Sequence, residues 1–131
     1  MAADHGKSAG AARRRRAQGA KADKLQTALE SLDPALGRWA DDFVFGEVWA
    51  DDALGQRERT LVAIAMLAAH TRRGQLRNYL HGALQNGIKE AELREVMKML
   101  TVYVGFPAAI ESLLELDSVA AAEARSRGES R

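Results

Sequence analysis

The recurrence of apolar residues at helical spacing is the feature that most restricts the folds open to this 131-residue chain. Residues 75–87 read QLRNYLHGALQNG, and in this stretch Leu76, Tyr79 and Ala83 fall on one side of a helix. Gly87 then supplies a residue type that commonly ends helices. Similar patterns recur along the chain, and no stretch alternates apolar and polar residues as a half-buried strand does. The sequence therefore predicts an all-α fold.

Helix boundaries can be predicted from aspartate, glycine and proline. Asp33 and Pro34 are residue types favoured at an N-cap and at the first helical position, and Gly105 and Pro107 indicate a second stop and restart. We expect about six helices, which start near residue 23, at residue 34, at residue 56, near residue 75, after residue 87 and near residue 107. Residues 61–69 are apolar on all sides, so we expect the third helix to be central and surrounded by protein.

Charge is distributed unevenly along the chain. Residues 1–21 carry six basic residues and one acidic residue, a net of +5, whereas residues 22–121 carry ten basic and fifteen acidic residues, a net of −5. After Met1, residues 1–21 include no apolar side chain larger than alanine, so burial cannot offset the entropy of ordering them. We predict a disordered basic arm over residues 1–21, one helical domain over residues 22–121 and a disordered tail over residues 122–131.

The arginine run at residues 13–16 leaves two interpretations open. A basic run can bind nucleic acid by releasing counterions from the phosphates. The absence of an interleaved aromatic residue for base stacking favours a simple solubilising extension.

The absence of cysteine excludes several classes of chemistry. Disulfides, thiolate metal sites, cysteine nucleophiles and dithiol redox centres all require it, and its absence is compatible with the cytoplasm. The longest apolar run is nine residues, while a membrane-spanning helix needs about 20. No secretory signal follows the basic start, because the next residues read AQGAKADK. We therefore expect a soluble cytoplasmic protein with no metal site.

The helix at residues 75–87 also carries the first candidate site. Arg77, His81 and Gln85 stand four residues apart and form a second row beside Tyr79. We consider Tyr79 and His81 candidate catalytic residues, and Arg77 a candidate for holding a substrate carboxylate. Structural interpretations stay open: Tyr79 as a core aromatic whose hydroxyl is bonded to a neighbour, and His81 as a solvated residue beside the apolar face.

Further candidates lie elsewhere in the chain. Glu58 and His70, at the two ends of the third helix, are candidate catalytic residues, but each also has the charge that the dipole favours at its helix end. Arg72, Trp49 and Tyr103 are candidates for substrate binding. Trp49 also suits packing in the core or at a subunit interface, and Tyr103 also suits packing in the core.

Four sequence pieces together carry a family resemblance: FGEVW, RTLVAIAMLAA, GALQNG and YVGFPAA. The chain resembles the carboxymuconolactone decarboxylase family, the cysteine-independent branch of the alkylhydroperoxidase D-like superfamily, from about residue 33 to residue 116. The resemblance implies an all-helical bundle that assembles into trimers or hexamers, with sites near subunit contacts and no cofactor. It also suggests a role in aromatic compound catabolism.

The chain departs from the family pattern at the site. The peroxidase branch uses a CxxC pair, which this chain lacks. The decarboxylase branch usually has a histidine where this chain has Tyr79, followed two places later by an arginine where it has His81. His81 does not simply replace that histidine, because positions two apart on a helix point about 200° apart. The usual Pro-Gly before the leucine of the turn is Asp52-Ala53 before Leu54.

Two functions are therefore expected as alternatives. The first is a cofactor-free lyase or isomerase of the carboxymuconolactone decarboxylase type, acting on a small anionic lactone or related carboxylic acid. The second is a non-catalytic oligomeric binding or scaffold protein that keeps the fold but has lost the catalytic histidine.

Overall fold

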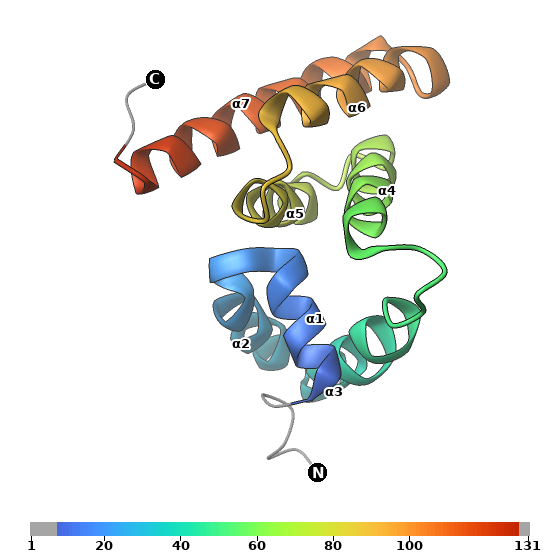
Figure 1. Cartoon of the computed structure of the whole chain (residues 1–131), viewed down its shortest axis with the longest axis vertical. Helices are drawn as coiled ribbons and strands as arrows, with labels where there is room; N and C mark the ends of the chain where they lie inside the picture. The colour runs from blue at the N-terminus through green and yellow to red at the C-terminus, as the bar shows by residue number, and fades with distance from the viewer. Residues whose placement is uncertain (1–7, 129–131) are drawn as a thin grey trace. The chain divides into compact units, whose positions relative to one another are not determined.

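The computed structural model describes residues 8–128, and every regular element in that range is helical (Figure 1). The all-α prediction is confirmed. The chain divides into two compact units, Met1–Gln56 (unit 1) and Arg57–Arg131 (unit 2). We describe each unit by itself.

Unit 1 is made of short helices. They are α1 (Ala9–Gln18), the 3-10 turn η2 (Gly19–Lys21), α2 (Ala22–Leu32), α3 (Pro34–Trp39) and the π-helix η3 (Ala40–Val48). Asp33 caps α3 as predicted, because its side chain accepts a hydrogen bond of 2.9 Å from the backbone N–H of Ala35. The helix expected to start at residue 34 changes to π-helical geometry at Ala40.

Helix α1 occupies part of the segment predicted to be a disordered arm. Ser8 caps it, and the Arg14 side chain, which is 2% exposed, binds the Asp41 carboxylate at 2.6 Å and the Ala22 carbonyl at 3.0 Å. The structure therefore differs from the prediction over residues 8–21, while residues 1–7 lie outside the described range. Composition suggested solvation, but the basic side chain is buried against an acid 27 positions away.

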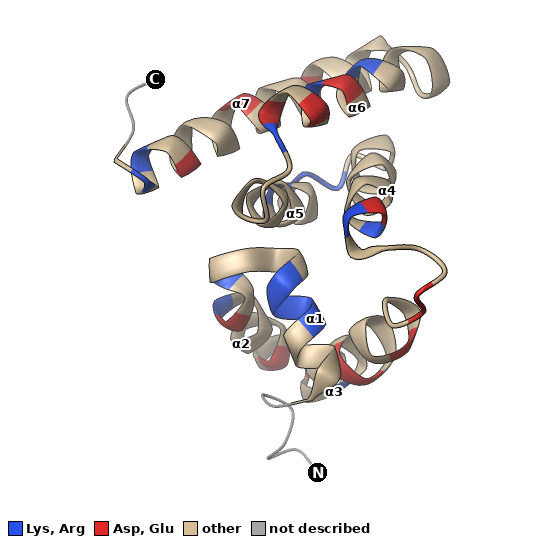
Figure 2. Ribbon diagram, viewed as in Figure 1, with Lys and Arg blue, Asp and Glu red and all other residues tan. Residues whose placement is uncertain are grey.

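The close packing of α1 on η3 depends on glycine. A Cβ at Gly10 would lie 1.9 Å from the backbone oxygen of Asp41, and a Cβ at Gly46 would lie 2.6 Å from the same oxygen. No other residue type lets two helix backbones approach this closely. The arginines of α1 are visible as the blue segment beside η3 in Figure 2.

Unit 2 contains the longer helices. They are α4 (Gln56–Ala69, which starts at the last residue of unit 1), α5 (Arg73–Gln85), α6 (Glu90–Tyr103) and α7 (Phe106–Ser126). Gly87 and Gly105 have φ values of +90° and +140°, so both glycines act as the predicted helix stops. Helix α7 continues to Ser126, which differs from the disordered tail expected from residue 122.

The core of unit 2 is apolar. Helices α6 and α7 form an antiparallel hairpin, and α5 packs across α7 (Figure 1). The largest fully buried apolar side chains are Ile64, Leu76, Leu80, Leu93, Met97, Leu116 and Val119.

Helix α4 buries only one face in this structure. Ile64 and Ala68 are buried, while Val62 and Met66 are 42% and 59% exposed. The expectation of a central helix surrounded by protein was wrong, because apolar composition on all sides does not require burial on all sides. No helix within residues 8–128 is both long enough and apolar enough to cross a membrane.

Candidate functional site

The polar row on α5 faces α7. Nη1 of Arg77 donates to the Glu115 carboxylate at 2.8 Å and lies 3.1 Å from the Ser118 hydroxyl oxygen. One turn later His81 and Gln85 reach a second carboxylate, that of Glu123. The spacing of four residues therefore placed the three side chains on one face, as predicted.

His81 forms an enclosed polar contact in unit 2. Its Nδ1 lies 2.6 Å from Oε1 of Glu123, and the two side chains are 5% and 8% exposed. Nε2 of Gln85 donates to the same carboxylate oxygen at 2.9 Å. The interpretation of His81 as a solvated residue was wrong, because α7 covers this part of α5.

The pKa of the Glu123 carboxyl reflects opposing effects. Burial raises it, but hydrogen bonds from His81 and Gln85, with nearby positive charge, outweigh burial and leave the pKa below the ordinary glutamate value. Glu123 is therefore ionised at neutral pH, and its carboxylate accepts a hydrogen bond from the Nδ1–H of His81.

Glu115 forms the second contact of the row. A hydrogen bond from Arg77, with a further contribution from Arg73 at 3.0 Å, lowers the pKa of the Glu115 carboxyl despite partial burial. Sequence reasoning missed both Glu115 and Glu123. Their separation of eight residues, about two helical turns, matched the row on α5 and was the available signal.

Tyr79 lies on a different side of α5 from His81. It is half-buried and packs against the apolar core of unit 2. Two positions separate the residues, so their side chains diverge by about 200° around the helix. The structure therefore assigns Tyr79 to the core side and His81 to the α7 side.

The other predicted site residues of unit 2 are exposed. Glu58 lies in the first turn of α4, His70 follows the last residue of α4, and Arg72 precedes α5. Tyr103, at the end of α6, is 79% exposed, so its interpretation as a core residue was wrong. None of the four is buried with His81 against α7.

Trp49 belongs to unit 1. Its ring packs against Phe45 with a centroid separation of 5.2 Å, and it also lines a cavity beside α1. Within residues 8–128, no group of three or more histidine, aspartate and glutamate residues is arranged to hold a metal ion.

Comparison with known proteins shows the family to which the sequence belongs. The model of the carboxymuconolactone decarboxylase family matches residues 34–118, which is well over half of the chain. The chain belongs to this family. Carboxymuconolactone decarboxylase family members form part of the alkylhydroperoxidase D-like superfamily, and the cysteine-free all-helical structure agrees with this placement.

Two curated relatives carry names that specify an activity. A 4-carboxymuconolactone decarboxylase of Acinetobacter baylyi is 39% identical over 80 residues, which cover 61% of this chain and 60% of that protein. The nitrosuccinic acid decarboxylase npaB of Metarhizium robertsii is 29% identical over 73 residues, 56% of this chain and 51% of that protein. The chain thus spans about half to three-fifths of the relatives it matches.

The family match includes some of the residues described above and leaves out others. The residues matched to the carboxymuconolactone decarboxylase family include Arg77, Tyr79, His81 and Glu115. Helix α1 lies before the match, and Glu123 lies five residues beyond it. The partner of His81 is therefore supplied from outside the segment that defines the family.

Proposed function

We propose that this chain is a cofactor-free lyase that decarboxylates a small anionic lactone or related carboxylic acid. Family membership and the names of both relatives support the reaction class. The observation that supports this site is the buried pair between His81 on α5 and Glu123 on α7, one turn from Arg77.

Decarboxylation sets three requirements for the protein. The bond to the departing carboxylate breaks, its electron pair passes into a conjugated carbonyl as CO2 leaves, and the remaining carbon takes up a proton. A site must hold the substrate, stabilise negative charge on the carbonyl oxygen and supply the proton.

His81 is the proposed proton donor. The hydrogen bond between Nδ1 and the ionised Glu123 fixes the ring, and Nε2 gives the proton to the substrate carbon. Glu123 acts through the imidazole and is a positioning residue. Gln85 holds the carboxylate from its other side.

Arg77 is the proposed binding group for a substrate carboxylate. Its contacts to Glu115 and Ser118 use Nη1, and a guanidinium carries five N–H donors. The remaining donors can pair with a carboxylate in a planar, two-bond arrangement. Arg77→Gln is expected to raise KM more than it lowers kcat.

Turnover of carboxymuconolactone and of nitrosuccinate by the purified full chain tests the proposal. Loss of general acid catalysis in His81→Gln should lower kcat by about 10²- to 10⁴-fold, whereas Tyr79→Phe should retain most of the activity. Arg94→Gln removes an exposed ion pair with Asp117 and serves as the control. Loss in Tyr79→Phe with full activity in His81→Gln would contradict the assignment of the proton donor.

A non-catalytic binding protein is the second candidate function. The family resemblance implies a histidine where this chain has Tyr79. The Glu123 carboxylate is already hydrogen-bonded to His81 and Gln85 inside the protein. This function predicts that neither substrate is turned over, while the thermal unfolding temperature still rises when carboxymuconolactone is added.

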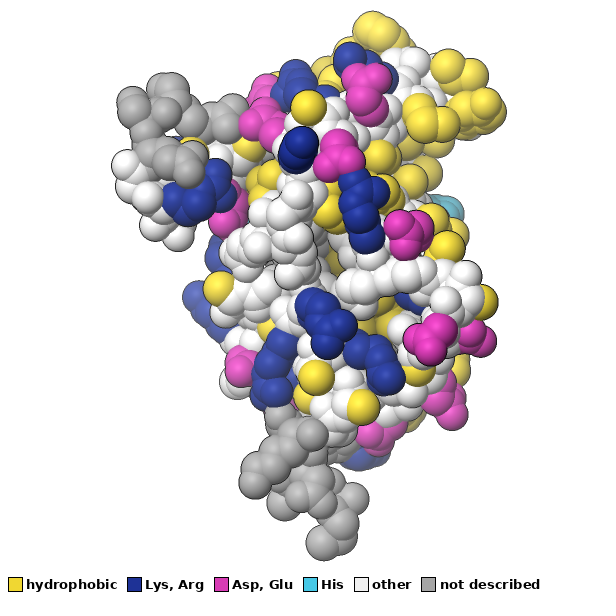
Figure 3. Space-filling view, viewed as in Figure 1, with side chains coloured by type: hydrophobic (Ala, Val, Ile, Leu, Met, Phe, Trp, Pro, Cys, Tyr) yellow, Lys and Arg dark blue, Asp and Glu magenta, His cyan; other side chains and the backbone are white. Residues whose placement is uncertain are grey.

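We also propose that the protein assembles into trimers or hexamers in the cytoplasm. Large apolar side chains gather where α6 turns into α7 (Figure 3): Met99, Val102, Tyr103, Phe106 and Ile110 are 45–79% exposed. A patch of this kind on a soluble protein commonly marks an interface. Light scattering should show dissociation in Tyr103→Glu and no change in the unit 1 control Leu32→Glu, which alters a side chain that is equally exposed.

A further inference from the structure

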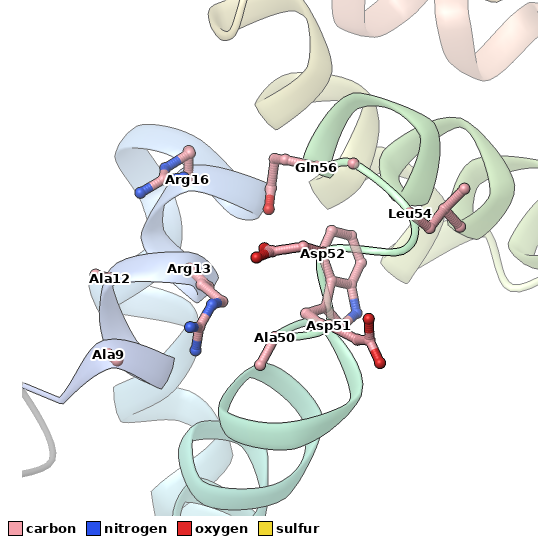
Figure 4. A pocket seen from close by; sticks show the side chains of 11 residues that line it. Ala9, Ala12, Arg13, Arg16, Ala50, Asp51, Asp52, Leu54 and Gln56 are labelled. Carbon is pink, nitrogen blue, oxygen red and sulfur yellow. The ribbon is translucent and has the colours of Figure 1, made fainter.

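Unit 1 contains a cavity that the proposed lyase site does not use. Its volume is about 450 Å³, within the range of about 300–1,000 Å³ common for small-molecule sites. One wall is a face of α1, and the other is the turn from Trp49 to Gln56 that follows η3 (Figure 4). Because α1 precedes the family match, one wall of the cavity comes from outside the segment that defines the family.

The sequence of α1 explains why one face is open. Ala9, Ala12, Arg13 and Arg16 follow the i, i+3, i+4, i+7 spacing and line the cavity. The two alanines leave space between the helix and the turn. The intervening arginines point elsewhere, since Arg14 is buried against Asp41 and Arg15 pairs with Asp23 at 2.9 Å.

Arg13 places a fixed cation on this wall. Its Nη1 donates to the Phe45 carbonyl at 3.1 Å, which anchors the side chain to η3. A guanidinium has four further N–H donors after this bond, and they suit the two oxygens of a carboxylate. Arg16 lines the same wall one turn later.

The opposite wall carries an acid. The Asp51 side chain accepts from the backbone N–H of Ala53 at 2.8 Å and turns away, whereas the Asp52 carboxylate extends toward α1 (Figure 4). Within residues 8–128, no ion pair joins Asp52 to Arg13. The cavity thus presents opposite charges on facing walls, with Trp49 and Leu54 as apolar lining.

We propose that this cavity binds a small amino acid with an apolar side chain. Its carboxylate pairs with Arg13, its ammonium group pairs with Asp52, and its side chain packs on Trp49 and Leu54. A simple carboxylate leaves Asp52 uncompensated, and a simple amine leaves Arg13 uncompensated, so a zwitterion matches both walls. The site is independent of the lyase function proposed for unit 2.

L-Leucine is a suitable probe for the full chain, with 4-methylpentanoate and 3-methylbutylamine as analogues that lack one charge each. Isothermal titration, supported by the fluorescence of Trp49, should show saturable L-leucine binding and at least about tenfold weaker binding of each analogue. Arg13→Gln and Asp52→Asn should each weaken L-leucine binding about tenfold. Asp52→Asn should also abolish the preference for L-leucine over 4-methylpentanoate.

Matched variants separate binding from folding. Arg15→Gln and Asp42→Asn remove equal charges that do not line the cavity, and both should bind L-leucine normally. Ala12→Leu keeps both charges but fills the cavity and should abolish binding. The proposal is overturned if L-leucine gives no saturable signal at millimolar concentration, if the analogues bind equally well, or if Arg15→Gln weakens binding as much as Arg13→Gln.

Discussion

Within the described chain, the fully buried apolar side chains of unit 1 are three alanines and Phe45, whereas unit 2 buries leucine, isoleucine, methionine and valine on all four of its helices. Unit 1 compensates with the Arg14–Asp41 pair, whose side chains are 2% and 0% exposed, and with glycines that bring α1 onto η3. Unit 2 places the Arg77–Glu115 and His81–Glu123 contacts between α5 and α7, beside an apolar core. The two units therefore depend on different interactions for stability.

This comparison indicates that removing one charge of a buried ion pair costs unit 1 more stability than unit 2. Burial of apolar area gains free energy roughly in proportion to area, and alanine contributes little of it. A single buried ion pair is costly when one partner is removed, because the other charge stays desolvated. Unit 1 should therefore be sensitive to one charged residue, and unit 2 should tolerate a comparable change better.

The largest expected effect is that of Arg14→Ala. Removal of the guanidinium leaves the Asp41 carboxylate buried without its cation, which should lower the free energy of unfolding of unit 1 by about 3–5 kcal/mol. Both tryptophans, Trp39 and Trp49, lie in unit 1, so their fluorescence during urea unfolding reports this unit.

Arg15→Ala is the matched control on the same helix. Its pair with Asp23 is exposed, and such pairs contribute about 0–1 kcal/mol. If Arg14→Ala and Arg15→Ala shift the tryptophan transition equally, the buried pair does not hold unit 1 together.

Acid should affect unit 2 through Glu115 and Glu123. The pKa of each carboxyl is lower in the folded chain than the ordinary value, so their interactions stabilise unit 2 above about pH 4.3 and are lost as the pH falls through the folded-state values. Hydrogen bonds to charged groups contribute about 1.5–3 kcal/mol each. Urea unfolding followed by far-UV circular dichroism should show this loss, and Glu123→Gln should make the dependence on pH shallower. An unchanged slope in that variant would show that Glu123 does not carry the effect.

Much of the fold of unit 2 could be predicted from local signals. The bounds of α4 and the stops at Gly87 and Gly105 follow from residues next to the boundaries they set, as does the Asp33 cap in unit 1. Helix α1 could not be predicted this way. Its ordering depends on Asp41, 27 positions away, and composition records the charge of Arg14 but not its partner.

The candidate site, like the fold, could be predicted only in part from the sequence. Periodicity placed Arg77 and His81 on one row, because four residues make about one turn of any helix. Their burial depends on Glu115 and Glu123, which α7 brings to the row only after the hairpin has formed. Likewise, the apolar character of Tyr103 suggested a core position, but a helix end does not bury every apolar side chain it carries.

Gly10→Ala tests the close approach in unit 1. Alanine is favoured over glycine in a helix by up to about 1 kcal/mol, yet the added Cβ would lie 1.9 Å from the Asp41 oxygen. We expect a loss of stability of roughly 1–3 kcal/mol, as for an overpacked interior. Thermal unfolding followed by tryptophan fluorescence measures it, and a stabilised variant would show that α1 and η3 are not in close contact.

Gly74→Ala is the corresponding change in unit 2 and the smallest effect. Gly74 lies in the first turn of α5 without a positive φ, and an added Cβ there meets nothing within 4 Å. The substitution restricts the unfolded chain without disturbing the folded one, so unit 2 should gain about 0.4–1 kcal/mol. Far-UV circular dichroism during urea unfolding measures the gain. Replacing glycine by alanine should therefore destabilise unit 1 at residue 10 and stabilise unit 2 at residue 74. The free space around the helix backbone, and not helix propensity, decides the sign of the effect on stability. A loss of stability in Gly74→Ala would mean that another part of the protein packs on the start of α5.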